Sequence, residues 1–156
     1  MAAVKTNAMR ILDAKKIKYS HYTYDPETTD GVLVAELLGQ PREKVFKTLV
    51  TQAASKNYYV FVIPVGETLD LKKAAKTVSE KSLAMIKQKE LLPLTGYVHG
   101  GCSPIGMKKQ FRTVFHESAT KQETICVSAG QRGNQIEVRV FELCSLVCGE
   151  YADITV

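Results

Sequence analysis

The chain has 156 residues, of which 45% are hydrophobic, and a formal net charge of +5 at pH 7. Its length is that of one compact domain, and no stretch approaches the roughly 20 consecutive apolar residues that span a bilayer, which excludes transmembrane helices. Residues 1–16 mix charged and apolar side chains and lack the apolar core of a signal peptide, so we expect a single cytoplasmic domain that covers residues 1–156.

The first forty residues predict two helices around an extended segment. Apolar residues follow the 3.6-residue period of a surface helix at Val4, Ala8, Ile11 and Leu12. Residues 21–26, HYTYDP, predict an extended segment that ends in a turn. Residues 31–41, GVLVAELLGQP, predict a short helix closed by Gly39 and Pro41.

The next segment predicts two strands and a helix. Two runs of β-branched and aromatic residues, 45–53 and 58–65, are separated by the polar sequence SKN and predict adjacent strands joined by a hairpin-like turn. Residues 58–63 are apolar on both faces, which is typical of a central strand. Asp70 is a predicted helix N-cap. The helix that follows it has its apolar stripe at Leu71, Ala74, Ala75 and Val78.

The second half of the chain predicts further helices and strands. A short helix is expected within residues 82–92, ended by Pro93, and a last short helix within residues 141–151. Three strands are predicted between them, in residues 112–117, 123–129 and 135–141. Helices and strands alternate irregularly, with short connections and no repeat, so we expect a mixed α+β fold around one curved sheet.

Positive charge is concentrated in one interval of the sequence. Residues 72–89 contain six lysines against Glu80 alone: Lys72, Lys73, Lys76, Lys81, Lys87 and Lys89. The concentration indicates an anionic partner, and a solvated lysine-rich helix face explains it equally well.

Lys47 lies in an apolar strand. Side chains alternate along a strand, so Lys47 shares its face with Val45 and Leu49, and the other face is also mostly apolar. A buried charge without a partner is costly. Lys47 therefore either extends its ammonium to water or opens onto a pocket, where a rigid cation holds an anionic or carbonyl group. We favour the pocket.

Cysteines and histidines offer weak alternatives for a metal site or a nucleophile. The four cysteines, without a secretion signal, indicate free thiols. Cys102 lies near His99, and Cys144 and Cys148 are one helical turn apart, but there is no CxxC or HxxxH pair, so neither a metal nor a cofactor is predicted. A Cys102 nucleophile with His99 or His116 lacks a third, orienting group, and the GxSxG element of serine hydrolases is absent.

Two glycine-rich loops remain as candidates. Residues 95–110, TGYVHGGCSPIGMKKQ, fit neither a Walker loop nor a dinucleotide-binding loop. Gly100 and Gly101 have no Cβ atoms, so they either expose backbone N–H groups to a developing oxyanion or simply form a tight turn. Residues 127–133, VSAGQRG, place Ser128 at the end of a predicted strand, where binding groups are common.

In chain order, the segments VFKTLV, LDLKKAAK, TGYVHGGCSPIGMKK and VSAGQRGNQIEV resemble the YbaK family of Cys-tRNA(Pro) deacylases, relatives of the editing domain of bacterial prolyl-tRNA synthetases. The resemblance extends from about Val4 to Ile154. It implies a mixed, partly barrel-like β-sheet surrounded by helices. It also implies hydrolysis, in trans and without a metal, of the ester that joins a mischarged amino acid to the 3′ end of tRNA.

The resemblance further implies roles for particular residues. Lys47 corresponds to the lysine of the family's KTL strand and contacts the terminal adenosine or its phosphate. Gly100 and Gly101 line the pocket with backbone N–H groups, and Tyr24 and Ser128 lie near the substrate. Several basic residues then follow the phosphates of the acceptor stem: Lys72, Lys73 and the other lysines up to Lys89, with Lys108, Lys109 and Arg112.

Several positions depart from the family pattern. Gln135 stands where some members have Asp, which puts a carboxylate contribution in doubt, while His99 and Cys102 replace aliphatic residues and inherit no catalytic role. In the family model the nucleophile is the substrate's own cysteine thiol, which cyclises onto the ester.

We therefore expect a Cys-tRNA(Pro) deacylase that binds the acceptor end of tRNA(Pro), with prolyl-tRNA synthetase as a candidate partner. Two alternatives remain open. One is a deacylase for another small amino acid on tRNA(Pro), such as alanine. The other is a non-catalytic tRNA-binding module that partners a synthetase.

Overall fold

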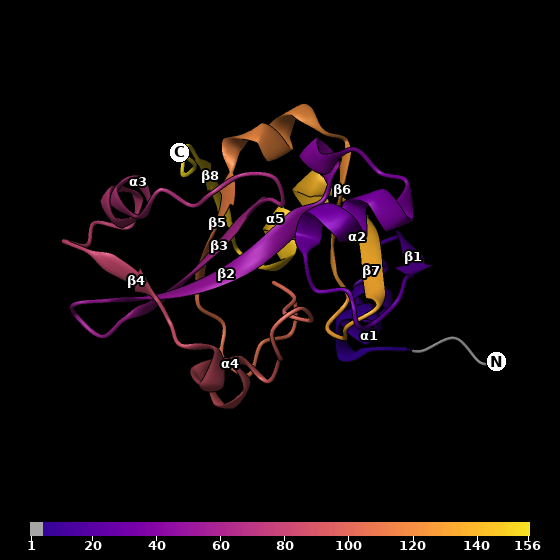
Figure 1. The fold of residues 1–156 in the computed structure, drawn as a ribbon, viewed down its shortest axis with the longest axis horizontal. Helices are drawn as coiled ribbons and strands as arrows, with labels where there is room; N and C mark the ends of the chain where they lie inside the picture. Colours follow the sequence, from indigo (N-terminus) through magenta and orange to yellow (C-terminus); the bar gives the residue numbers. More distant parts are fainter. Residues whose placement is uncertain (1–4) are drawn as a thin grey trace.

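The computed structural model describes residues 5–156, and its strands form two sheets (Figure 1). The smaller sheet is antiparallel, with the order β1 (Tyr19–Thr23), β7 (Asn134–Arg139) and β6 (Thr124–Ser128). The larger sheet has the order β4 (Leu83–Met85), β2 (Phe46–Ala53), β3 (Tyr58–Pro64), β5 (Arg112–His116) and β8 (Glu150–Ala152). A parallel bridge between Val45 and Cys126 joins the two sheets.

Helices lie around the sheets and complete a mixed α+β fold, as the sequence predicted (Figure 1). They are α1 (Asn7–Ala14), α2 (Gly31–Leu38), α3 (Leu71–Thr77), α4 (Gln88–Thr95) and α5 (Val140–Leu146), with short 3₁₀ turns η1 (Arg42–Lys44) and η2 (Glu117–Lys121). Both sheets contribute to the main core, and α1 and α5 pack against it. The single curved sheet that we predicted is thus divided in two, because β2 and β6 meet at one bridge rather than along a ladder.

The predicted helix ends are confirmed where a cap was visible in the sequence. The predicted N-cap Asp70 begins α3 and accepts hydrogen bonds from the N–H groups of Lys72 and Lys73. The helix α1 begins in the same way at Thr6, a cap that we did not predict, which accepts from the N–H of Met9. Gly39 ends α2 in the left-handed conformation, with φ of 68°. Val4, which we expected in the first helix, lies outside the described residues.

The predicted hairpin and central strand are confirmed. β2 pairs antiparallel with β3 from Phe46 opposite Pro64 to Gln52 opposite Tyr58. β3 also pairs in parallel with β5, so both of its edges are occupied. Residues 60–63 are fully buried, which accounts for the apolar run on both faces of this strand.

Two predicted boundaries are wrong. The helix expected within residues 82–92 is present as α4 but begins only at Gln88, because residues 83–85 form the short strand β4, which pairs with the edge of β2. Pro93 lies inside α4, because the last turn continues past it and ends at Gly96, with φ of 88°. The strand expected in residues 135–141 ends at Arg139, where α5 begins. Within residues 5–156, no helix is long and apolar enough to cross a membrane.

Candidate active site

A cavity of about 150 Å³ lies where the two sheets meet. Four residues that the sequence predicted for the site line it together: Tyr24, Lys47, Gly100 and Ser128. They come from four segments, namely the turn after β1, the start of β2, the loop after α4 and the end of β6. The fold therefore brings these predicted residues into one pocket.

The register of the smaller sheet explains why β1, β6 and β7 contribute to one wall. Ser128 pairs with Gln135 across β6 and β7, and Gln135 pairs with Tyr22 across β7 and β1. Paired positions lie on the same face of a sheet, and alternate residues of a strand share a face. Ser128, Gln135 and Tyr24 accordingly meet at the cavity.

Lys47 is a half-buried cation in the cavity wall. Its Nζ donates a long hydrogen bond of 3.4 Å to the carbonyl oxygen of Val65. Burial lowers the pKa of Lys47 below its ordinary 10.5, although the carboxylates of Asp30 and Glu67 oppose the shift. Among the ion pairs of residues 5–156, none includes Lys47. The ammonium is therefore available to an anionic or carbonyl oxygen of a ligand.

Gly100 must be glycine in this loop. Its φ is +85°, and a Cβ atom would lie 2.8 Å from Cγ2 of Thr29, so a side chain would be both strained and crowded. Within residues 5–156, no backbone hydrogen bond from the Gly100 N–H is found. This amide can donate to a ligand in the cavity.

Gly101 has a different environment. Its N–H donates to the carbonyl oxygen of Val98 at 3.0 Å, and the residue is buried outside the cavity lining. A Cβ atom on Gly101 would lie 3.0 Å from the backbone nitrogen of Arg132, in the other glycine-rich loop. We predicted that the N–H groups of both glycines face an oxyanion. Of these two, the Gly100 N–H is the one without a backbone hydrogen bond and is therefore the remaining candidate.

The two glycine-rich loops hold each other in place. Arg132 Nε donates to the carbonyl oxygen of His99 at 2.7 Å. Ser128 Oγ accepts from the N–H of Gly130 at 3.1 Å and so closes the turn at the end of β6. Ser128 is 7% exposed and lines the cavity, where its hydroxyl proton remains available as a donor.

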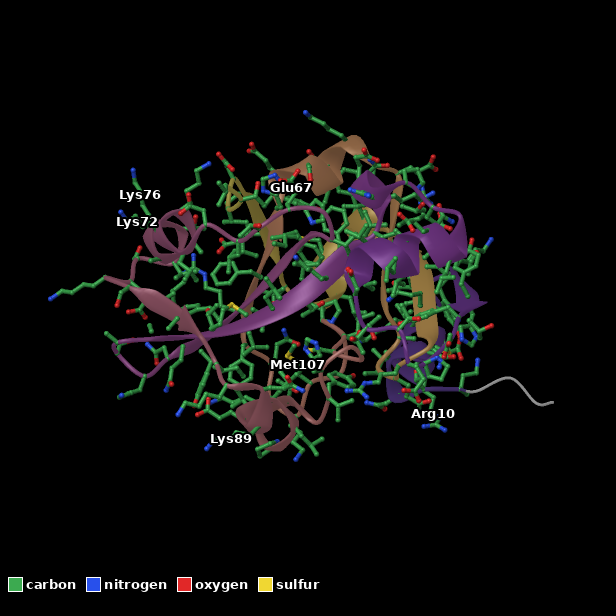
Figure 2. All side chains as sticks on the ribbon, viewed as in Figure 1. Arg10, Glu67, Lys72, Lys76, Lys89 and Met107 are labelled. Atoms are coloured by element: carbon green, nitrogen blue, oxygen red, sulfur yellow. The ribbon has the colours of Figure 1, made fainter. Side chains whose placement is uncertain are left out.

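Lys72 and Lys73 lie outside the cavity. Both are exposed on α3, at one end of the molecule (Figure 2). Lys73 forms an ion pair of 3.0 Å with Asp153 and also donates to the carbonyl oxygen of Thr155. Any contact of these two lysines with a substrate must therefore involve parts of a tRNA remote from the ester.

The cysteines and histidines do not form a catalytic pair. Cys102 and His99 line the cavity, but burial raises the pKa of the Cys102 thiol to about 12, so it is protonated at neutral pH and is a poor nucleophile. His116 lies on β5, where its Nδ1 accepts from the N–H of Ile154. Within residues 5–156, no three His, Cys, Asp or Glu side chains gather as a metal site would require.

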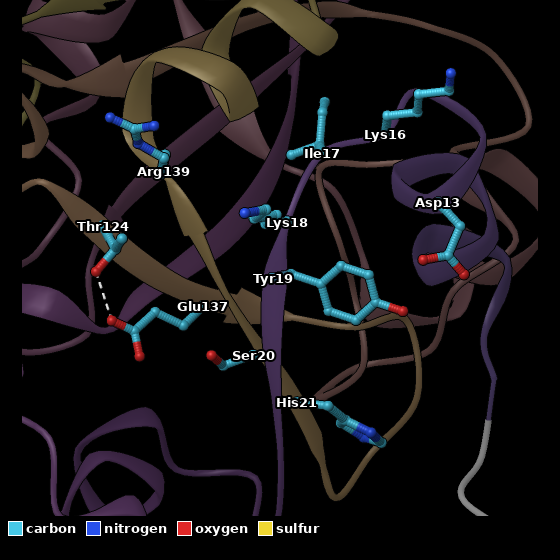
Figure 3. Close-up of a pocket in the computed structure, with 10 residues that line it drawn as sticks. All are labelled: Asp13, Lys16, Ile17, Lys18, Tyr19, Ser20, His21, Thr124, Glu137 and Arg139. Atoms are coloured by element: carbon cyan, nitrogen blue, oxygen red, sulfur yellow. Dashed lines mark hydrogen bonds between the residues drawn. The ribbon is translucent and has the colours of Figure 1, made fainter.

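A larger hollow of about 850 Å³ lies beside β1, lined by residues of α1, β1, β6 and β7 (Figure 3). Its acceptor side chains Asp13 and Glu137 already have partners. Burial alone would raise the pKa of Glu137, but hydrogen bonds from Lys44, Thr124 and Tyr22 outweigh it and hold the pKa at about 2. His21 is bonded to Asn134 at 2.8 Å. The acceptors of this hollow are thus engaged, whereas its basic residues Lys16, Lys18 and Arg139 form no ion pair within residues 5–156.

The smaller cavity contains two polar atoms that lack partners. Gln135 Oε1 and Thr48 Oγ1 are buried and have no hydrogen-bond partner, and both residues line the cavity. Sequence reasoning noticed Gln135 only as a departure from the family pattern and missed Thr48. The signal in the sequence was that both are polar residues among apolar neighbours, on β2 and β7. The sequence does not show that their oxygen atoms lack hydrogen-bond partners, because this depends on the fold.

The chain is similar to known aminoacyl-tRNA editing proteins. The family model described as an aminoacyl-tRNA editing domain matches residues 25–146. A protein of Enterococcus faecalis, provisionally named Cys-tRNA(Pro)/Cys-tRNA(Cys) deacylase EbsC, is 45% identical over 153 residues, which cover 97% of this chain and 93% of the relative. A proline–tRNA ligase of Fervidobacterium nodosum is 28% identical over 98 residues, or 63% of this chain and 17% of the ligase.

Solved structures share the fold. A protein described as a candidate trans-editing enzyme for prolyl tRNA synthetase superposes with a TM-score of 0.83 at 21% identity, and the match covers 99% of each chain. This likeness confirms the predicted fold class. The family model and the Enterococcus relative show that the chain belongs to the aminoacyl-tRNA editing domain family.

Proposed function

We propose that the chain is a trans-acting aminoacyl-tRNA deacylase whose preferred substrate is Cys-tRNA(Pro). The observation that carries the proposal is the meeting of Lys47, Gly100 and Ser128 at one small cavity, in a chain 45% identical to a protein named for this activity. At about 150 Å³, the cavity is smaller than the roughly 300–1,000 Å³ pockets that hold drug-sized ligands. It suits an aminoacyl group, with the terminal nucleotide at its mouth.

The cavity supplies the charge stabilisation that ester hydrolysis needs. Attack on the ester carbonyl produces a tetrahedral intermediate with a negative oxygen, and fixed donors lower the energy of that oxygen. The Gly100 N–H and the Lys47 ammonium are donors in the cavity wall. Ser128 adds a hydroxyl that donates to a neighbouring oxygen of the substrate.

The nucleophile is the thiol of the substrate's own cysteine, as the family resemblance implies. Its sulfur forms a bond to the carbonyl carbon while the bond from that carbon to the tRNA 3′ oxygen breaks, and the thiol proton ends on that oxygen. Water then opens the cyclic thioester to free cysteine. This route needs no nucleophilic side chain, which agrees with the raised pKa of Cys102.

The proposal also assigns a cellular context. Aminoacyl-tRNA is made and used in the cytoplasm, and we place the protein there. Prolyl-tRNA synthetase is the candidate partner, because a proline–tRNA ligase contains a segment similar to 63% of this chain. Selectivity for tRNA(Pro) would then come from the synthetase that charges it.

A panel of charged tRNAs tests the function. Purified protein should release cysteine from Cys-tRNA(Pro), and homocysteine from the same tRNA, but should leave serine attached, since serine has no thiol. Equal rates for cysteine and serine would contradict the thiol route. Preferential release of alanine would support an alanine deacylase instead, and tRNA binding without any release would support a non-catalytic module.

Lys47→Ala tests the site with the same assay. Removal of the ammonium should lower kcat/KM for Cys-tRNA(Pro) by about 100-fold or more, the scale on which single donors to an oxyanion act. Circular dichroism should show an unchanged fold. Full activity in this variant would remove Lys47 from the mechanism, whereas Lys76→Ala, an exposed change on α3, should have no effect on release.

A further inference from the structure

Gln135 is a polar residue of the cavity wall to which the proposed function gives no task. It lies on β7, only 6% of it is exposed, and it lines the cavity together with Lys47 and Ser128. Its amide oxygen is buried and has no hydrogen-bond partner. Within residues 5–156, no side-chain hydrogen bond satisfies this oxygen.

An unsatisfied buried amide destabilises a fold, so native proteins keep few of them. Another polar residue on the same face of β7 does have hydrogen-bond partners. Glu137, two residues further along β7, accepts hydrogen bonds from Tyr22, Lys44 and Thr124. Gln135 has no comparable set of partners, and its position at the cavity indicates that a ligand supplies them.

One group of an aminoacyl ester needs a hydrogen-bond acceptor in the cavity, and Gln135 offers one beside the Thr48 hydroxyl. The ester carries an α-ammonium, which needs hydrogen-bond acceptors when it leaves water. Lys47, Gly100 and Ser128 offer donors to the substrate, and neither Asp nor Glu is among the cavity-lining residues of the described chain. A glutamine amide oxygen is a strong neutral acceptor, and its broad terminal torsion lets it turn toward a ligand.

We propose that the amide oxygen of Gln135 accepts a hydrogen bond from the α-ammonium of the aminoacyl group. This contact fixes the orientation of the aminoacyl group, so that the ester carbonyl meets Lys47 and Gly100 in one way only. The assignment rests on the proposed deacylase function and adds a substrate-binding residue to it. It also explains why the fold retains an unpartnered amide at this point.

Two substitutions separate an acceptor role from other roles. Gln135→Met keeps the length of the side chain and removes both polar atoms, and Gln135→Glu keeps an acceptor oxygen but removes the NH₂ donor. For Cys-tRNA(Pro), kcat/KM should fall about 10- to 100-fold in Gln135→Met, as expected for a lost hydrogen bond to a charged group, and should stay within about fivefold of wild type in Gln135→Glu.

A substrate without the amino group provides the matching control. The ester 3-mercaptopropionyl-tRNA(Pro) keeps the thiol and lacks the ammonium. If Gln135 acts through the ammonium, Gln135→Met should change the rate of hydrolysis of this ester by less than about threefold, as in a double-mutant cycle. A stability measurement separates this role from a structural one. Gln135→Met should raise the melting temperature, because it removes an unsatisfied buried amide.

Three results would overturn the assignment. They are wild-type activity in Gln135→Met, equal losses in Gln135→Met and Gln135→Glu, or equal losses of Gln135→Met on both substrates. If the wild-type protein releases no amino acid from any charged tRNA, the proposed function fails and this assignment with it. If wild type is active and one of the three results appears, the assignment alone fails.

Discussion

Lys47 combines a cost in stability with the role in catalysis that we propose for it. Its side chain lies in an apolar strand, donates only a long hydrogen bond to Val65, and is half-buried. Burial lowers its pKa, which means that the folded state disfavours the charged form relative to the unfolded chain. The alternation of side chains on β2 indicated this conflict in the sequence, and the cavity explains why it is retained.

The Lys47→Met variant should be more stable than wild type at neutral pH, and the proposed mechanism predicts that it is inactive. At pH 7 the lysine is protonated in both states, so its unfavourable burial lowers the free energy of unfolding of the wild type. As pH rises through the lowered pKa toward 10.5, the folded lysine loses its proton first and this penalty disappears.

Urea unfolding of both proteins between pH 7 and pH 10.5 measures the effect. The stability gain of Lys47→Met should be largest at pH 7 and should shrink as the pH rises. The exposed substitution Lys76→Met should show no such trend. A gain that grows with pH would mean that the native state stabilises the Lys47 charge.

At the scale of elements, the two glycine-rich loops form one unit. The loop after α4 carries Gly100 and Gly101, and Arg132 of the loop between β6 and β7 binds the carbonyl oxygen of His99. Gly101 fits against the backbone of Arg132 without room for a Cβ atom. The position of the Gly100 amide thus depends on the close approach of the two loops.

Gly101→Ala should disturb this approach without touching the cavity. The new methyl group would meet backbone atoms at 3.0 Å and 3.2 Å, and backbone cannot move aside as easily as a flexible side chain. We expect a loss of about 1–3 kcal/mol of stability, as for other overpacked sites, and a clear fall in kcat for Cys-tRNA(Pro).

Gly66→Ala is the matched control, because its Cβ would lie 3.6 Å from Cδ of Arg42, an ordinary contact with a flexible side chain. Thermal unfolding and turnover should both be close to wild type in this variant. If Gly101→Ala behaves like Gly66→Ala, the loops adjust freely and the packing of Gly101 does not position the site.

The sequence predicted elements whose signals are local. Asp70 and Gly39 specify helix ends by capping, and the apolar run of residues 58–63 specifies a central strand. β4 was missed because Leu83–Met85 is a strand only through its pairing with β2. The same reason explains which site residues could be predicted. Lys47 and Gly100 were predicted from the sequence. That the Gly101 N–H is already hydrogen-bonded and that the Gln135 amide oxygen has no partner depends on how the chain folds.

At the scale of the whole molecule, the lysines of residues 72–89 are divided between two regions. Lys72 and Lys76 lie on α3 at one end, and Lys89 lies on α4 at another side (Figure 2). α4 adjoins the cavity, which its Leu91 lines, and the N–H of Lys108 donates to the carbonyl oxygen of Thr95 at the end of that helix. No residue of α3 lines the cavity. A tRNA whose 3′ end enters the cavity should therefore meet α4 and the following loop first.

Removal of two charges from each region tests this path. Lys89→Gln with Lys108→Gln should weaken tRNA binding and reduce the log–log salt slope by about 2, roughly one for each lost phosphate contact. Lys72→Gln with Lys76→Gln removes the same net charge from α3 and should leave the slope almost unchanged. Filter binding between about 50 and 200 mM salt distinguishes the two double variants, because the salt slope changes when a phosphate contact is lost. Equal losses in both variants would show that the tRNA also contacts α3, and the lysines of residues 72–89 would then act as one surface.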